Sequence, residues 1–208
     1  MTKIIEIYKQ YGIPQKLQDH MLRVAACGAI ICQNWHGPSV SFEKLMRILL
    51  LHDMGNLVKV VEEYDEPGFL ENRDKYRKLF GKDDHAVSAH IGKELGLTDE
   101  ELWILQQKSF MNSENILNSD SYEIKIAAYC DQRVAPEGVT SLIERMLEGK
   151  ERYKDRPGTS FNNPNTDKMI ACMMKIEKQI IEYCSLPPEE ICTETIAPYI
   201  KELSQFEI

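Results

Sequence analysis

The chain has 208 residues, a formal net charge of −8 at neutral pH, and 43% hydrophobic residues, which indicates one globular domain with a buried core. We therefore treat residues 1–208 as a single domain. The acidic balance disfavours non-specific binding to nucleic acid backbones, which needs clustered Lys and Arg, so we expect no nucleic acid polymer as a partner.

Helical periodicity dominates the chain from its first residues onward. We predict a short helix over residues 2–11, ended by Gly12 and Pro14, and a longer helix with one apolar stripe over residues 15–34. Ser41 is expected to cap the next helix, whose apolar run leads into a histidine and an aspartate. These elements alternate with turns and give no sign of a sheet.

The second part of the chain continues this helical pattern. Residues 62–83 are highly charged, and we predict a loop there with one short solvated helix. Thr98 and Ser141 are each followed three residues later by a glutamate, which is the pattern of a capping box. The predicted fold class is all-α, with a motif-bearing core over about residues 15–150. Further helices are predicted over residues 84–96, 98–110, 122–134, 141–153, 167–184 and 188–203.

The most informative stretch runs from Leu49 to Gly55, where His52 and Asp53 follow three leucines. An unpaired carboxylate in a buried segment is costly, so Asp53 needs a compensating partner. A metal ion shared with His52 would serve, and imidazole with carboxylate suits Fe, Mn, Co, Ni or Zn better than Ca. The alternative is a satisfied core histidine beside a salt-bridged aspartate.

Two more residues extend this pair into a wider pattern. His20, His52 with Asp53, and Asp131 each fall on a predicted helix, and in this order they resemble the HD-domain superfamily of metal-dependent phosphohydrolases over residues 15–150. The resemblance implies a helical bundle with all four side chains around one divalent ion, which could be Mn, Fe, Co, Ni, Mg or Zn. It also implies hydrolysis of a phosphate ester by metal-activated water, which Asp53 would orient.

Histidines between the pair and the final aspartate vary among HD-domain subfamilies. His85 looks like the additional histidine of many subfamilies, with a catalytic role as a phosphate-contacting acid or as a ligand to a second metal. His90 is more readily interpreted as a packed or surface imidazole. Two-metal subfamilies add a histidine where this chain has residues 106–109, which contain none, so one metal is favoured.

Basic residues near the predicted ligands are candidates for binding the substrate phosphate. Arg23 comes one turn after a predicted ligand, Arg133 follows the final aspartate, and Lys59 lies beyond the His-Asp pair. Lys108 is a weaker candidate, and we interpret residues 144–154 as a solvated helix face. The expected substrate is a small phosphorylated molecule, either a nucleotide or a related phosphomonoester.

Other interpretations use the same residues for different functions. One alternative is an HD-scaffold oxygenase with two irons, and another is a non-catalytic module that senses a nucleotide. The sequence has no signal peptide and no apolar stretch of membrane-spanning length, so we expect a cytoplasmic protein that does not engage a membrane. Apolar residues between Met169 and Ile180 could pair two copies as a homodimer, or could cover the chain's own core.

Overall fold

The computed structural model describes residues 1–61, 64–156 and 159–208, and the fold is all-α as the sequence predicts. The α-helices are α1 (Ile4–Tyr11), α2 (Gln15–Gln33), α3 (Phe42–Leu51), α4 (Phe69–Phe80), α5 (Asp84–Glu94), α6 (Asp99–Gln107), α7 (Ser113–Leu117), α8 (Tyr122–Asp131), α9 (Leu142–Tyr153), α10 (Thr166–Ile181) and α11 (Thr193–Leu203). Short 3₁₀ helices are η1 (Met54–Val58), η2 (Phe110–Asn112) and η3 (Pro188–Glu190), and a small antiparallel hairpin joins β1 (Val134–Ala135) to β2 (Gly138–Val139).

Several helix starts follow local capping chemistry. The side chain of Ser41 accepts a hydrogen bond from the backbone of Lys44, which fixes the start of α3. Thr98 opens α6 and Ser141 opens α9 with complete capping boxes, as the sequence predicts. These boundaries can be predicted locally because the groups that satisfy the free backbone N–H groups lie within three residues of the cap.

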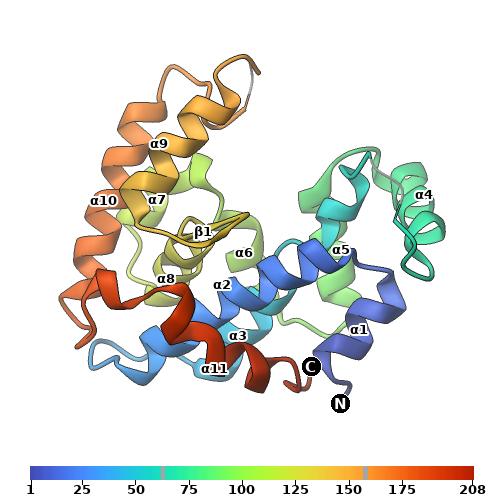
Figure 1. Cartoon of the computed structure of the whole chain (residues 1–208), viewed down its shortest axis with the longest axis horizontal. Helices are drawn as coiled ribbons and strands as arrows, with labels where there is room; N and C mark the ends of the chain where they lie inside the picture. Colours follow the sequence, from blue (N-terminus) through green and yellow to red (C-terminus); the bar gives the residue numbers. More distant parts are fainter. Residues whose placement is uncertain (62–63, 157–158) are drawn as a thin grey trace.

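The α2 helix runs through the middle of the molecule and packs against α3, α8 and α11 (Figure 1). To one side lie α1, α4 and α5, and on the other side α9 and α10 extend side by side (Figure 1). Gly28 lets α2 approach α3 closely, since a Cβ at this position would lie 2.4 Å from Cδ1 of Leu49. This close contact brings α2 and the end of α3 to the same region of the core.

Some element boundaries differ from the sequence prediction. The α3 helix ends at Leu51, so His52 and Asp53 lie in the turn between α3 and η1 and not on the helix itself. The α8 helix ends at Asp131 and a small hairpin follows, whereas the sequence predicts helix through residue 134 and no sheet. The final helix begins at Thr193 because a 3₁₀ turn occupies the preceding segment.

Two segments contain more helix than the sequence predicts. The charged segment 62–83 carries α4, which is longer than the short helix predicted there, and its residues 62–63 lie outside the described part of the chain. The buried side chains of Phe69 and Tyr76 anchor α4 to the core. The Asn- and Ser-rich segment before α8 contains η2 and the short α7.

The apolar face of α10 lies in the core of its own chain. Met173, Ile176 and Ile180 are fully buried there, which accounts for the apolar residues that the sequence offers for a homodimer. The homodimer itself stays a prediction. No helix among the described residues combines the length and the apolarity needed to cross a bilayer.

Candidate metal centre

The end of α3 presents His52 in one fixed orientation. Its Nδ1 donates a hydrogen bond to the carbonyl oxygen of Leu49 at 2.7 Å, so the lone pair of the ring lies on Nε2. Tyr8 donates to the carbonyl oxygen of Leu50 at 2.6 Å. These two bonds satisfy carbonyls that the end of a helix would otherwise leave free, and they hold the imidazole in place.

The turn that follows depends on Gly55. A Cβ at this position would lie only 2.0 Å from the carbonyl oxygen of Asp84, so a larger residue would push η1 away from α5. The Gly55 backbone N–H donates to Oγ of Ser88 at 2.9 Å, which ties the turn to α5. The glycine after the His-Asp pair therefore sets the close packing that positions the pair.

Four predicted ligands meet at one point, with one ligand atom from each lying within 4.8 Å of the others. His20 comes from α2, His52 and Asp53 from the turn after α3, and Asp131 from the last position of α8. Nε2 of each histidine lies 3.4 Å from Oδ1 of Asp131. Oδ2 of Asp53 lies 3.6 Å from Nε2 of His20 and 3.7 Å from Nε2 of His52.

This group could hold a metal ion. Four ligands placed about 2.1 Å from one ion in a tetrahedron lie about 3.4 Å apart, close to the four histidine–carboxylate separations given above. Nε2 of His52 is buried and has no hydrogen-bond partner among the described residues, although buried polar atoms are nearly always paired. A cation between the ligand atoms would satisfy this nitrogen and separate the two carboxylates.

Lys108 joins the group from the end of α6. Its Nζ lies 3.0 Å from Oδ2 of Asp131, and its side chain is only 7% exposed. Burial acts to lower the pKa of Lys108, but the carboxylates of Asp131 and Asp53 outweigh it and raise that pKa. Burial likewise acts to raise the pKa of Asp131, but the positive charge of Lys108 outweighs it and holds that pKa well below its usual range. Both groups are therefore charged at neutral pH.

Arg23 is brought to the same region as the ligands. With His20 it lines a pocket of about 530 Å³, and its guanidinium lies 3.4 Å from the carbonyl oxygen of Pro136. The pocket wall is completed by α2, η1, the β1 hairpin and α9. Its lining residues are Pro14, Lys16, Leu17, Asp19, His20, Arg23, Asn56, Val60, Tyr64, Val134, Ala135, Pro136, Arg145 and Arg152.

Other predicted site residues lie elsewhere. The side chain of Arg133 is buried, and it donates to the carbonyl oxygens of Thr140 and Ile191, so it ties the hairpin to the segment before α11. Nζ of Lys59 lies 2.7 Å from Oδ2 of Asp84. Each of the two side chains therefore contacts another residue of the chain, and neither lines the pocket.

The two remaining histidines of α5 stand outside the four-residue group. His85 is exposed to solvent on the first turn of α5. His90 lies 3.4 Å from Glu94 and packs against the rings of Tyr76 and Phe80, which agrees with its interpretation as a packed imidazole. Neither histidine supplies a ligand atom to the group.

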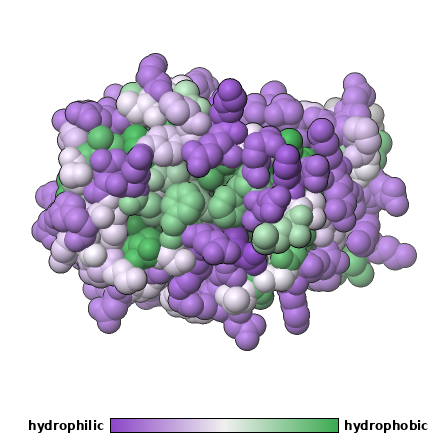
Figure 2. Space-filling model, turned by 90° about the horizontal axis from the view of Figure 1, so that it is seen from below, coloured by the Kyte–Doolittle hydropathy of each residue, from purple (hydrophilic) through white to green (hydrophobic). Residues whose placement is uncertain are grey.

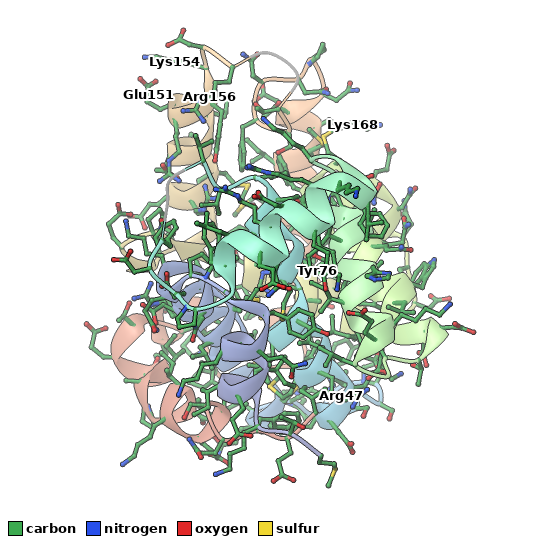
Figure 3. All side chains as sticks on the ribbon, turned by 90° about the vertical axis from the view of Figure 1, so that its right-hand side faces the viewer. Arg47, Tyr76, Glu151, Lys154, Arg156 and Lys168 are labelled. Carbon is green, nitrogen blue, oxygen red and sulfur yellow. The ribbon has the colours of Figure 1, made fainter. Side chains whose placement is uncertain are left out.

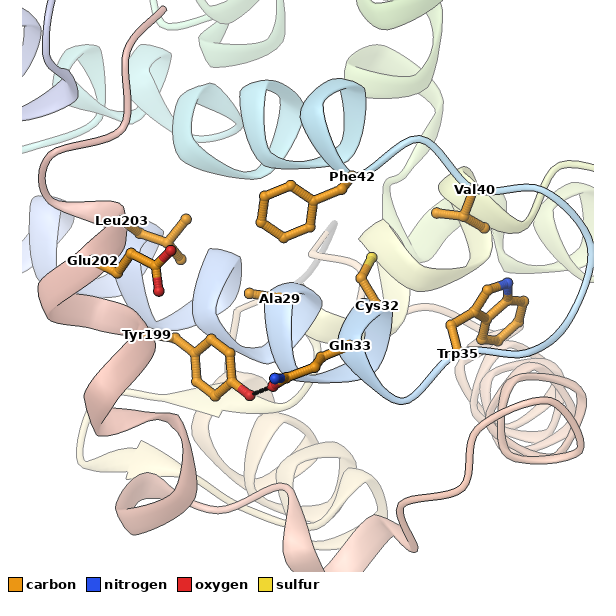
Figure 4. A pocket seen from close by; sticks show the side chains of 9 residues that line it. All are labelled: Ala29, Cys32, Gln33, Trp35, Val40, Phe42, Tyr199, Glu202 and Leu203. Atoms are coloured by element: carbon orange, nitrogen blue, oxygen red, sulfur yellow. Dashed lines mark hydrogen bonds between the residues drawn. The ribbon is translucent and has the colours of Figure 1, made fainter.

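A separate cavity of about 350 Å³ lies between α2, α3 and α11. The face of the molecule seen in Figure 2 has a hydrophobic area near its middle, and the cavity walls in Figure 4 are largely apolar. Phe42, Trp35 and Leu203 contribute to these walls, while Tyr199 is hydrogen bonded to Gln33. The residues that line this cavity bring no cluster of ligands or bases together, in contrast to the pocket beside His20.

The sequence does not predict the position of three residues at or beside the site. It indicates Lys108 only as a weak phosphate contact, and it assigns Arg145 and Arg152 to a solvated helix face. Their positions depend on how α6 and α9 pack against α2 and α8, and a local pattern carries no information on this packing. The sequence neighbours of Lys108 are polar (Gln106, Gln107 and Ser109), so no local signal points to its burial.

Comparison of the chain with protein-family models, with curated proteins and with solved structures gave no match.

Proposed function

We propose that this protein is a metal-dependent phosphohydrolase of the HD-domain type that acts on a small phosphorylated molecule, either a nucleotide or a related phosphomonoester. The observation that carries this proposal is a group of two imidazoles and two carboxylates beside a basic pocket. The group has the donor types of a catalytic divalent-metal site, and the pocket supplies cations for phosphate oxygens.

A divalent ion held by His20, His52, Asp53 and Asp131 would supply hydroxide near neutral pH by lowering the pKa of water, and would neutralise phosphoryl charge. The protein's own contribution is to fix the ligands. The bond from His52 to Leu49 keeps the free lone pair of the imidazole directed at the group. The contact with Lys108 keeps Asp131 ionised and oriented.

The charge of the group favours an anionic substrate once a dication is bound. Two carboxylates and the ammonium of Lys108 leave one net negative charge when both histidines are neutral. A dication therefore changes the centre to one net positive charge, and Arg23 in the adjoining pocket adds another. In a chain whose overall charge is −8, this local positive field would select small anions that can enter a pocket.

The ligand set favours a site for one metal ion over a site for two. Among residues 1–61, 64–156 and 159–208, the only group of three or more metal-capable side chains is the one described above. Oδ2 of Asp131, which could bridge to a second ion, faces Lys108 instead. This disfavours the two-iron oxygenase, whereas the nucleotide-sensing module stays open as an alternative.

Metal analysis combined with phosphate release tests the proposed function. Metal content of the purified protein would be measured alongside phosphate release from nucleotides and sugar phosphates with Mn²⁺, Fe²⁺, Co²⁺, Ni²⁺, Mg²⁺ or Zn²⁺. We expect about one ion per chain and release that requires the ion. Two irons without phosphate release would favour the oxygenase, and nucleotide binding without turnover under every metal would favour the sensing module.

A further inference from the structure

The pocket beside the metal centre is more basic than binding one phosphate requires. Its wall contains four cationic side chains, those of Lys16, Arg23, Arg145 and Arg152, and a single carboxylate, that of Asp19. Asp19 is held by a hydrogen bond from Gln15 at 2.8 Å. Because the whole chain carries an excess of acidic residues, this concentration of positive charge is a local feature of the pocket.

The cations come from two sides of the pocket. Lys16 and Arg23 belong to α2, which also carries His20, whereas Arg145 and Arg152 lie on α9. The two α9 arginines are seven residues apart, which is about two helical turns, so they lie on the same side of the helix. The pocket wall also includes apolar and aromatic side chains from Val60, Tyr64, Val134, Ala135 and Pro136.

The two α9 arginines already share an anion from their own helix. Glu148 lies between them in the sequence, with one carboxylate oxygen 2.9 Å from Nη1 of Arg145 and the other 2.5 Å from Nη2 of Arg152. The side chain of Glu148 is 36% exposed, so it can turn into solvent without losing a buried position. Nε of Arg145 is buried and has no hydrogen-bond partner within the described part of the chain, which leaves a donor unused.

We infer that the substrate carries two phosphate groups on one small scaffold. This inference rests on the proposed function. One phosphate would lie at the metal centre near Arg23, and the second would replace Glu148 between Arg145 and Arg152. The apolar wall between the two ends would contact the scaffold, and the pocket volume of about 530 Å³ is in the range of small-molecule sites. Paired guanidinium groups suit a phosphate because each offers two parallel donors.

Binding to metal-free protein tests the second phosphate position without any hydrolysis. Adenosine 3′,5′-bisphosphate would be titrated into the wild-type protein and its variants in the presence of EDTA. Titration calorimetry would measure the affinity. Arg152→Ala should weaken binding by about tenfold to a hundredfold, the loss of one or two charge-assisted hydrogen bonds. Glu148→Gln should tighten binding, because the competing carboxylate is removed while the side-chain shape is kept.

Arg156→Ala is the charge-matched control. Arg156 lies beyond the end of α9, with Glu151 and Lys154 near it at the tip of the helix pair (Figure 3), and it packs on the ring of Tyr153. It does not line the pocket, so its removal should leave the affinity unchanged. Arg152→Ala is preferred to Arg145→Ala as the test variant, because Arg145 also packs over the ring of Phe161 and its removal would disturb this contact.

Kinetics with the metal-loaded protein separate this inference from the proposed function. Arg152→Ala should raise KM for the bisphosphate about tenfold and leave KM for adenosine 5′-monophosphate unchanged. Equal effects on both substrates, or unchanged bisphosphate binding in EDTA, would overturn the second phosphate position. Bisphosphate binding that responds to Arg152 and Glu148 without phosphate release would uphold the position and overturn the hydrolase.

Discussion

Lys108 and Asp131 form an ion pair behind the metal centre, with Nζ 3.0 Å from Oδ2. The other oxygen of Asp131, Oδ1, faces both histidines at 3.4 Å. One oxygen of the carboxylate thus contacts the ammonium group of Lys108, and the other faces the position where a metal ion would lie. This arrangement links α6 to α8 and limits how much negative charge the centre offers to a metal.

Replacing Lys108 with Met should change metal affinity and folding in opposite directions. The metal should bind more tightly, by about tenfold, because a nearby positive charge is removed. Without metal the unfolding free energy should fall by about 1–3 kcal/mol, since Asp131 loses its partner. Metal titration and urea denaturation in EDTA would measure both quantities. Weaker metal binding in the variant would contradict this role for Lys108, and Lys44→Met, which removes a lysine ion pair outside the ligand group, is the control.

His52→Ala should abolish metal binding and phosphate release together. The side chain supplies the buried Nε2 that has no other partner among the described residues, so no neighbouring group can replace it. His85→Ala is the matched control, since His85 lies exposed outside the ligand group and its loss should leave metal content unchanged. Metal content would be measured after dialysis against a fixed free-metal concentration. Loss of metal in both variants, or in neither, would refute the ligand assignment.

The low pKa of Asp131 predicts a pH-dependent contribution to stability in the metal-free protein. A carboxyl group whose pKa is lower in the folded state stabilises that state above its unfolded pKa of about 3.9, and the contribution declines as the pH falls below it. The difference in unfolding free energy between wild type and Asp131→Asn should be constant from about pH 5 to 7 and shrink below about pH 4. Urea denaturation in EDTA across this range would measure it, and a difference that stays constant down to about pH 3 would disagree.

Gly55→Ala should destabilise the fold and disturb the metal centre. The added Cβ would overlap the backbone of α5, and overpacking of this kind costs about 1–3 kcal/mol. Gly96→Ala is the control for destabilisation away from the centre, because an alanine at a φ of +77° is strained while a Cβ added there would meet nothing within 4 Å. We expect Gly96→Ala to keep full metal affinity and Gly55→Ala to lose part of it. Equal metal affinity in both would show that the η1–α5 contact does not position the ligands.

The fold class, most helix starts and the four residues that meet at the centre are predictable from the sequence. This is because capping residues act within one turn, because His52 and Asp53 follow an apolar run, and because His20 and Asp131 complete a pattern that resembles the HD-domain superfamily. The position of His52 and Asp53 beyond the end of α3 is not predictable in this way, since Tyr8 and Leu50 interact there across 42 positions of the chain. Some partners of Arg133 are equally distant, so its internal role does not follow from its neighbours.

The two ends of the described chain are hydrogen bonded to each other. The backbone of Thr2 exchanges two hydrogen bonds with Ile208, and the N–H of Ile4 donates to the carbonyl oxygen of Phe206. The two ends accordingly lie near each other in Figure 1. A short peptide could therefore join the ends without moving α1 or α11. The molecule is therefore suited to circular permutation. New ends could be opened in an exposed turn such as that near Gly81, which contains none of the four ligands.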